Sequence, residues 1–189
     1  MILRLVQRLL SGQPPRSFRF RCAAAAVADE AGCKYSKGWA PGVRKKRLVA
    51  TFENTVLIRR PIEKVFAFLD DFENVSKWNY AIVETRKVSE GPVGVGTTYQ
   101  QVRSVPSHSE ERFEVTAHNP PHQLEIQGQF GPFPSRLAYA LDAVPEGTRV
   151  TNSVELELRG PGRLLRRVAV PRIRDAVATN LRKLKELLE

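Results

Sequence analysis

Beyond Cys33 the sequence contains no cysteine, and no apolar run in its 189 residues approaches the length needed to span a bilayer. Cys22 and Cys33 lie far from any histidine at metal-ligand spacing, which excludes a cysteine-based zinc site and a disulfide framework. Acidic residues are also absent from residues 1–28. A long cysteine-free region fits a reducing compartment, so we expect a cytoplasmic location.

The net charge of +10 at pH 7 is spread unevenly along the chain. Residues 1–47 carry eleven Lys and Arg against two acids, whereas residues 48–189 carry nineteen against eighteen. A nearly neutral folded part argues against nucleic acid as a partner, because nucleic-acid binding needs a basic surface. Residues 163–189 are locally basic, with eight Lys and Arg against three acids. This segment is either a solvated outer face or a weak contact site for an anionic membrane.

Residues 1–47 differ in composition from the rest of the chain. Beyond Gly12 they are rich in Pro, Arg, Ala and Gly without sustained periodicity, which predicts a disordered or non-native extension. Because the first 28 residues are Arg-rich, acid-free and open with a short basic amphipathic stretch, an organelle transit peptide is an alternative, as is a genuine basic arm. We expect one folded domain over residues 50–189.

From residue 50 the hydrophobic pattern predicts a strand, two short helices, six strands and a long helix. The first strand covers residues 55–58, and Pro61 then favours a first helical turn. That helix ends near Asp70, and a second one is indicated by the spacing of Phe72, Val75 and Trp78. The remaining strands, each bounded by turn residues, are predicted at 82–88, 97–105, 111–117, 124–130, 136–143 and 149–158.

The C-terminal segment carries an apolar stripe at steps of three and four residues, which predicts a long amphipathic helix. The stripe consists of Val170, Ile173, Val177, Leu181, Leu184 and Leu188. Pro171 predicts a kink, or a regular helix that starts nearby. A strongly curved antiparallel sheet cannot bury its concave face against itself, so we expect this helix to cover it. The predicted fold class is α+β, with about seven strands.

Three motifs in this order are similar to those of one superfamily. Residues 60–71 (RPIEKVFAFLDD) resemble its strand, proline and helix ending in Asp, and residues 73–79 (ENVSKWN) resemble its second short helix closed by a tryptophan. Residues 94–99 (GVGTTY) resemble the Gly-x-Gly-Thr start of its third strand. Residues 52–188 thus resemble the START-like (SRPBCC, polyketide cyclase/dehydrase and lipid transport) superfamily with its birch-pollen-allergen-like helix-grip fold. The resemblance implies a cavity for a small apolar ligand and selects no subfamily.

Strand alternation assigns side chains to the two faces of the sheet. The inner face is apolar along all four strands from residue 111 to 158, and the outer face carries Glu114, Thr116, Glu125, Glu155 and Glu157. Ala117 is expected on the inner face with Phe113 and Val115. Tyr139 and Asn152 are also expected there, either hydrogen-bonded within the fold or aimed at a cavity.

The predicted ligand-binding set combines aromatic and polar residues with part of the helix stripe. It consists of Trp78, Tyr80, Tyr99, Phe113, Phe130, Phe133, Tyr139, Asn152, Ile173, Val177 and Leu181. Plain core packing is the alternative for many of them. The leading prediction is that they bind or carry a small hydrophobic molecule of the lipid, polyketide or isoprenoid type.

Two further functions stay open, and no cofactor, metal site or catalytic residue is predicted. His108, His118 and His122 lie near strand ends or loops, and no Gly-x-Ser-x-Gly motif precedes a helix. A polyketide cyclase/dehydrase-type enzyme would pair Tyr139 with Arg112 or Arg136, but alternation places both arginines on the outer face. A partner-binding protein like the superfamily's chaperone activators is the third reading. The oligomeric state is not predicted.

Overall fold

The computed structural model describes residues 48–158 and 162–189, so the predicted extension at residues 1–47 lies outside the described residues. Seven antiparallel strands form one sheet in the order β1-β7-β6-β5-β4-β3-β2, with β1 and β2 at its edges. The strands are β1 (Leu48–Ile58), β2 (Ile82–Lys87), β3 (Thr98–Arg103), β4 (Ser109–Asn119), β5 (Gln123–Phe130), β6 (Phe133–Val144) and β7 (Gly147–Leu158). This arrangement confirms the predicted α+β class.

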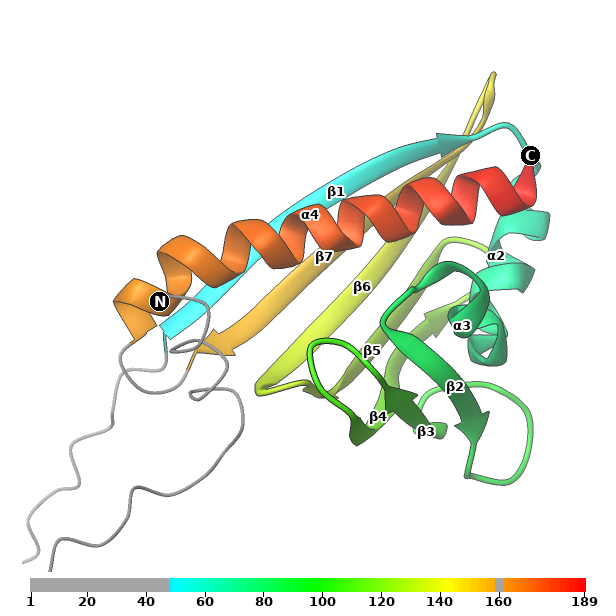
Figure 1. Cartoon of the computed structure of the whole chain (residues 1–189). Coiled ribbons are helices and arrows are strands. Elements are labelled where there is room, and N and C mark those ends of the chain that lie inside the picture. The colour runs from blue at the N-terminus through cyan, green and yellow to red at the C-terminus, as the bar shows by residue number, and fades with distance from the viewer. Residues whose placement is uncertain (1–47, 159–161) are drawn as a thin grey trace, which may run out of the picture. The chain divides into compact units, whose positions relative to one another are not determined.

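Two short helical segments and one long helix complete the fold. The helix α2 (Ile62–Asp70), the 3-10 turn η1 (Phe72–Asn74) and the helix α3 (Val75–Trp78) follow β1, and α4 (Gly162–Leu188) closes the chain. Figure 1 shows α4 extended along β1 and β7, with α2 and α3 near its C-terminal end. The helices and the concave face of the sheet share one buried apolar cluster, as a curved sheet requires.

The two helices after β1 confirm the sequence prediction. Pro61 precedes α2, which buries Ile62, Val65, Phe66 and Leu69 on one side. After α2 ends at Asp70, the Asp71 carboxylate accepts a hydrogen bond from the Glu73 backbone N–H at 3.1 Å and starts η1. This local capping explains why the chain turns here instead of extending α2.

The first strand is longer than predicted. β1 begins at Leu48, which pairs with Leu158, and continues to Ile58, which pairs with Thr148. Ala50 and Phe52 are buried on the inner side, while Thr51 and Glu53 are not. The short prediction treated residues 48–54 as a polar lead. Pairing along the whole of β7 makes them a strand, since β1 is an edge with one polar face.

A register shift in β4 corrects the prediction for Ala117. The shift lies between Val115 and Ala117, so Ala117 stands opposite Glu125, and His118 stands opposite Leu124 on the inner side. An extra residue in a bulged strand reverses the alternation beyond it. The His118 Nε2 lies 2.8 Å from the Asp70 Oδ1 and ties β4 to α2, which agrees with a structural histidine.

The helix α4 runs through Pro171 without ending, so a regular helix that starts only near this proline is excluded. Its apolar stripe is buried unequally. Leu181 and Leu184 are 2% and 0% exposed, whereas Val170, Ile173 and Val177 stay partly exposed although they pack on apolar residues of β1 and β7. In the described ranges no helix is long and apolar enough to cross a membrane.

Candidate ligand-binding site beneath the C-terminal helix

The strand ladders align the inner-face residues in rows across the sheet. One row joins six strands and consists of Tyr99, Phe113, Gly128, Ser135, Leu156 and Ala50. A second row, next to α2, consists of His118, Leu124, Tyr139, Asn152 and Asn54. Tyr139 and Asn152 are therefore directly paired neighbours. The Asn54 Nδ2 donates to the Arg174 carbonyl oxygen at 3.5 Å, which places this row beneath the middle of α4.

Several predicted site aromatics form a packed cluster. The rings of Tyr99 and Phe113 stack at 5.2 Å with an interplanar angle of 11°, and Phe72 lies 4.8 Å from the Tyr99 ring. Phe130 extends the cluster, with its centroid 5.8 Å from that of Phe113. Trp78, Tyr99 and Phe113 are all buried. The structure thus places these three within the core, where they stabilise the fold through apolar burial.

Tyr80 lies apart from the other predicted site residues. Its side chain is 57% exposed, because it follows α3 and precedes the edge strand β2 at the rim of the sheet. Sequence spacing grouped Tyr80 with Trp78, yet only Trp78 turns inward. A side chain this exposed does not line an interior space.

The partly exposed apolar residues gather under the N-terminal half of α4. Val170, Ile173 and Val177 come from the helix, and Phe133 and Leu137 come from β6. Leu137 and Val177 also border the main core, so this patch is continuous with it. We call these five residues the apolar cradle. Side chains on facing surfaces that stay partly exposed indicate incomplete packing at this end of the helix.

Buried polar atoms without a partner lie on the same side of the sheet. Within the described residues the Trp78 Nε1, the Asn152 Oδ1 and the Asn180 Oδ1 are buried and make no hydrogen bond. The amide groups of both asparagines are used, since Asn152 donates to the Ala138 carbonyl at 3.3 Å and Asn180 to the Asn79 Oδ1 at 3.0 Å. Burial raises the pKa of the Tyr139 hydroxyl, which therefore stays protonated and remains a donor.

Sequence reasoning missed a buried charged group on the inner face. The Glu111 carboxylate accepts from the Arg103 Nε and from the Gln101 Nε2, each at 2.6 Å, and from the Gly131 backbone N–H at 2.5 Å. Alternation with Phe113 and Tyr99 was the available signal, because Glu111 and Gln101 stand two residues from them. Both oxygens of Glu111 are thus engaged, and the group fastens the β5–β6 turn to β3 and β4.

Asn180 was also missed, because it lies beside the apolar stripe of α4 in sequence. Within the described ranges no group of three or more His, Cys, Asp or Glu side chains is placed to hold a metal ion. The inner face therefore offers an apolar cradle, a protonated tyrosine, amide oxygens and one engaged ion pair. Such a surface is suited to binding a largely apolar molecule with a few polar atoms.

Known folds agree with this architecture. The structure of Ara h 8.0201 is similar over 74% of this chain and 97% of its own, at 20% identity and a TM-score of 0.60. TTHA0849 from Thermus thermophilus gives 74%, 95%, 21% identity and a TM-score of 0.60. The di-domain ARO/CYC StfQ from the steffimycin biosynthetic pathway is matched over 75% of this chain and 51% of its own, at 14% identity and a TM-score of 0.60.

No curated protein matches the chain significantly. The family model described as polyketide cyclase / dehydrase and lipid transport matches residues 49–189, which cover the whole of the sheet and the C-terminal helix. The chain therefore belongs to the polyketide cyclase/dehydrase and lipid transport family and has its helix-grip fold.

Proposed function

We propose that the chain binds a small, largely apolar molecule between the N-terminal half of α4 and the concave face of the sheet. The observation that carries the proposal is the contrast along one helix stripe. Leu181 and Leu184 are fully packed, whereas Ile173 and Val177 remain partly exposed over apolar sheet residues. An apolar ligand would cover surface that the protein leaves accessible to water.

The polar atoms near the cradle narrow the chemistry of the ligand. The paired Tyr139 and Asn152 offer a donor hydroxyl and an unpartnered amide oxygen. Both lie in the row beneath the middle of α4, next to Ile173 and Val177 in the sequence order of the helix. A carbonyl or hydroxyl oxygen on a lipid, polyketide or isoprenoid skeleton would complete these hydrogen bonds, since buried unpaired polar atoms cost about 1–3 kcal/mol each.

The family model and the solved structures support this reading at the level of the fold. The family description names lipid transport, and one similar structure is described as an ARO/CYC protein of a biosynthetic pathway. A ligand that hides about 300 Å² of apolar surface gains about 7 kcal/mol before the costs of association. That gain is sufficient for binding that a titration can measure.

The test is a titration of the full chain with the apolar fluorophore N-phenyl-1-naphthylamine. We expect saturable binding with a stoichiometry near one. Val177→Trp places a large ring in the cradle and should weaken binding by at least about tenfold, which corresponds to about 1.4 kcal/mol. Leu187→Trp is the matched control, because Leu187 is exposed on the same helix and should leave binding unchanged. Equal binding by the two variants would refute the proposal.

A cyclase or dehydrase activity is the second candidate. Tyr139 is a buried, protonated acid on the inner face. Arg136, a suggested helper, pairs with Glu125 at 3.1 Å and is half exposed on the outer face, and Arg112 is exposed as well. The inner arginine, Arg103, is engaged with Glu111. These contacts favour binding over catalysis, and a Tyr139→Phe variant that turns over a polyketide substrate normally would exclude this acid.

The outer face of α4 supports a weak contact with anionic membranes. Exposed basic residues surround one exposed apolar residue there, namely Arg167, Arg172, Arg174, Arg182 and Lys183 around Val168. A cationic helix face is attracted to anionic headgroups. Sedimentation with phosphatidylserine vesicles should retain the chain at low salt and release it at high salt. Binding to a protein partner through this face or a sheet edge is the competing outcome, and it would leave the chain unbound to vesicles.

A further inference from the structure

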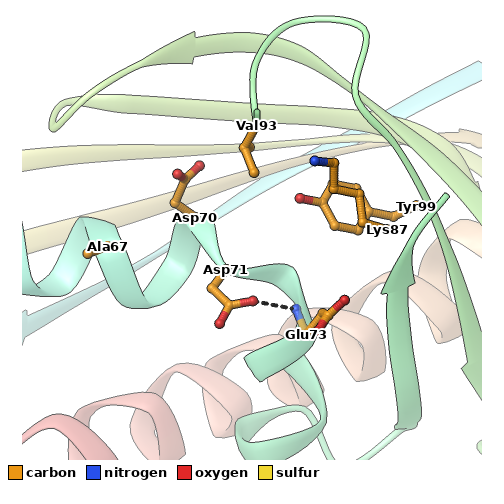
Figure 2. Close-up of a pocket in the computed structure, with 7 residues that line it drawn as sticks. All are labelled: Ala67, Asp70, Asp71, Glu73, Lys87, Val93 and Tyr99. Atoms are coloured by element: carbon orange, nitrogen blue, oxygen red, sulfur yellow. Dashed lines mark hydrogen bonds between the residues drawn. The ribbon is translucent and has the colours of Figure 1, made fainter. Parts of the chain in front are cut away.

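A second hollow lies away from the apolar cradle, between the C-terminal end of α2, η1 and the strands β2 and β3. It is a cleft of about 280 Å³. Its walls carry three carboxylates, Asp70, Asp71 and Glu73, together with Lys87 and the hydroxyl of Tyr99 (Figure 2). We call it the acidic cleft. None of the partly exposed residues of the apolar cradle lines it, so it is a separate feature of the fold.

The Tyr99 hydroxyl is the most informative atom of the cleft. The side chain is only 2% exposed, and its ring is held between Phe113 and Phe72 at centroid distances of 5.2 and 4.8 Å. Within the described part of the chain this hydroxyl makes no hydrogen bond, and Figure 2 shows it pointing into the space that the acidic residues surround. A ring fixed in the core therefore presents an unpaired polar atom to the cleft, a costly arrangement unless a molecule there binds it.

The charges around the hydroxyl are predominantly negative. Asp71 is used in capping, because its oxygens accept from the Glu73 N–H at 3.1 Å and from the Asn74 Nδ2 at 2.9 Å. Asp70 shares one oxygen with His118 at 2.8 Å. In the described residues the Glu73 carboxylate has no hydrogen-bond or ion-pair partner. The Lys87 Nζ donates to the Gly91 carbonyl of the β2–β3 connection.

The negative potential reaches the hydroxyl itself. Burial, followed by the charges of Asp70, Asp71 and Glu73, raises the pKa of Tyr99 to about 12. The hydroxyl is thus neutral at ordinary pH and acts as a hydrogen-bond acceptor for a cation or as a donor to a carboxylate. A cation bound beside it would offset the three carboxylates that Lys87 alone does not balance.

The spread of the carboxylates indicates the size of the cation. These side chains are not grouped closely enough to hold a metal ion, and the same is true of every His, Cys, Asp and Glu cluster in the described residues. The cleft volume equals that of about nine water molecules at about 30 Å³ each. An organic cation of a few heavy atoms fits both observations, because its donors are separated by several ångströms and its body needs space.

We propose that the acidic cleft binds a small organic cation with an ammonium or guanidinium group, which donates to Glu73 and Asp70 and to the hydroxyl oxygen of Tyr99. Charge-assisted hydrogen bonds of this kind are the strong ones in proteins. The site is independent of the apolar cradle, so either can exist without the other. Its ligand is distinguished from that of the cradle by charge.

The experiment is a calorimetric and NMR titration of the full chain with n-butylammonium and n-butylguanidinium, and with N-butylurea as the neutral isostere of the guanidinium. We expect one saturable site for at least one of the two cations, none for the urea, and binding that weakens as salt is raised. Glu73→Gln should weaken binding by at least about tenfold. Glu63→Gln, which neutralises an exposed acid in the first turn of α2, is the matched control and should change nothing.

A second readout concerns Tyr99 directly. A bound cation stabilises tyrosinate, so saturation with it should lower the pKa of Tyr99 in an alkaline absorbance titration, and Tyr99→Phe should remove that transition. Should Tyr99→Phe fail to fold, Glu73→Gln decides alone, because Glu73 is outside the core. Cation binding no stronger than urea binding, or equal losses in Glu73→Gln and Glu63→Gln, would overturn the proposal. Binding of the apolar fluorophore is expected to be unaffected in every case.

Discussion

Gly128 and Phe113 stand opposite each other in the β4–β5 ladder, so close that a Cβ on Gly128 would lie 2.7 Å from the Phe113 Cβ and 2.5 Å from the Arg112 carbonyl oxygen. Real Cβ atoms do not approach this closely, and the obstacles include backbone. The absence of a side chain at Gly128 therefore permits the two strands to approach where the sheet bends around Phe113.

Gly128→Ala should consequently destabilise the fold by about 1–3 kcal/mol, because the strands must separate to admit the methyl group. Gly94→Ala is the matched control, since a Cβ there meets nothing within 4 Å. The free energy of unfolding in urea measures both. Equal stability of the two variants would show that β4 and β5 separate without cost.

Arg103→Met should cost about 3–5 kcal/mol, because it leaves the buried Glu111 carboxylate without its counter-charge. Arg136→Met breaks an ion pair of similar kind on the outer face, where Arg136 is half exposed, and should cost at most about 1 kcal/mol. Chemical denaturation of the two variants gives the comparison. A small loss for Arg103→Met would mean that Glu111 gains water or a proton at little cost.

Trp78→Ala should lower the free energy of unfolding by about 3–5 kcal/mol, because the indole is buried in the main core. Trp78→Phe should cost much less, since the Nε1 has no partner to lose within the described residues. Thermal and urea unfolding measure both variants. An unchanged stability of Trp78→Ala together with lost fluorophore binding would instead identify Trp78 as a gate of the cradle.

Removal of residues 1–46 should leave the melting temperature within a few degrees of that of the full chain, because Arg47–Glu189 forms a compact unit of its own. The cut must precede Leu48, where β1 begins, and not fall near residue 50 as the sequence pattern alone suggests. A second deletion that also removes residues 48–54 takes away buried Ala50 and Phe52 and should unfold the domain. Circular dichroism during heating compares the three chains. A large loss for the shorter deletion would mean that the first 46 residues stabilise the domain.

The order of strands and helices was predictable from the sequence because it depends on local signals. Pro61 and Asp71 mark the boundaries of α2, and Gly and Pro residues separate the strands. The side-chain period of each strand likewise assigned Tyr139 and Asn152 to the inner face, where the structure places them. Local periodicity identifies a face without knowing what covers it.

The site was less predictable, because it depends on contacts between distant segments. The bulge in β4 reversed the alternation at Ala117, and no local signal marks it. Tyr80 follows Trp78 by two residues, yet it is exposed because nothing packs over the rim beside β2. The ion pair of Glu111 with Arg103 was hidden among outer-face acids, although its parity was available in the sequence.

By itself the sequence determined an α+β chain whose apolar C-terminal stripe must cover a curved sheet, because period and turn chemistry are properties of neighbouring residues. Only the tertiary structure decided that Leu181 is closed core while Val177 of the same stripe stays accessible. It also turned the Tyr99 hydroxyl toward the acids at the end of α2. Exposure and hydrogen bonding are set by what the chain brings from far away, and that information is absent from any single segment.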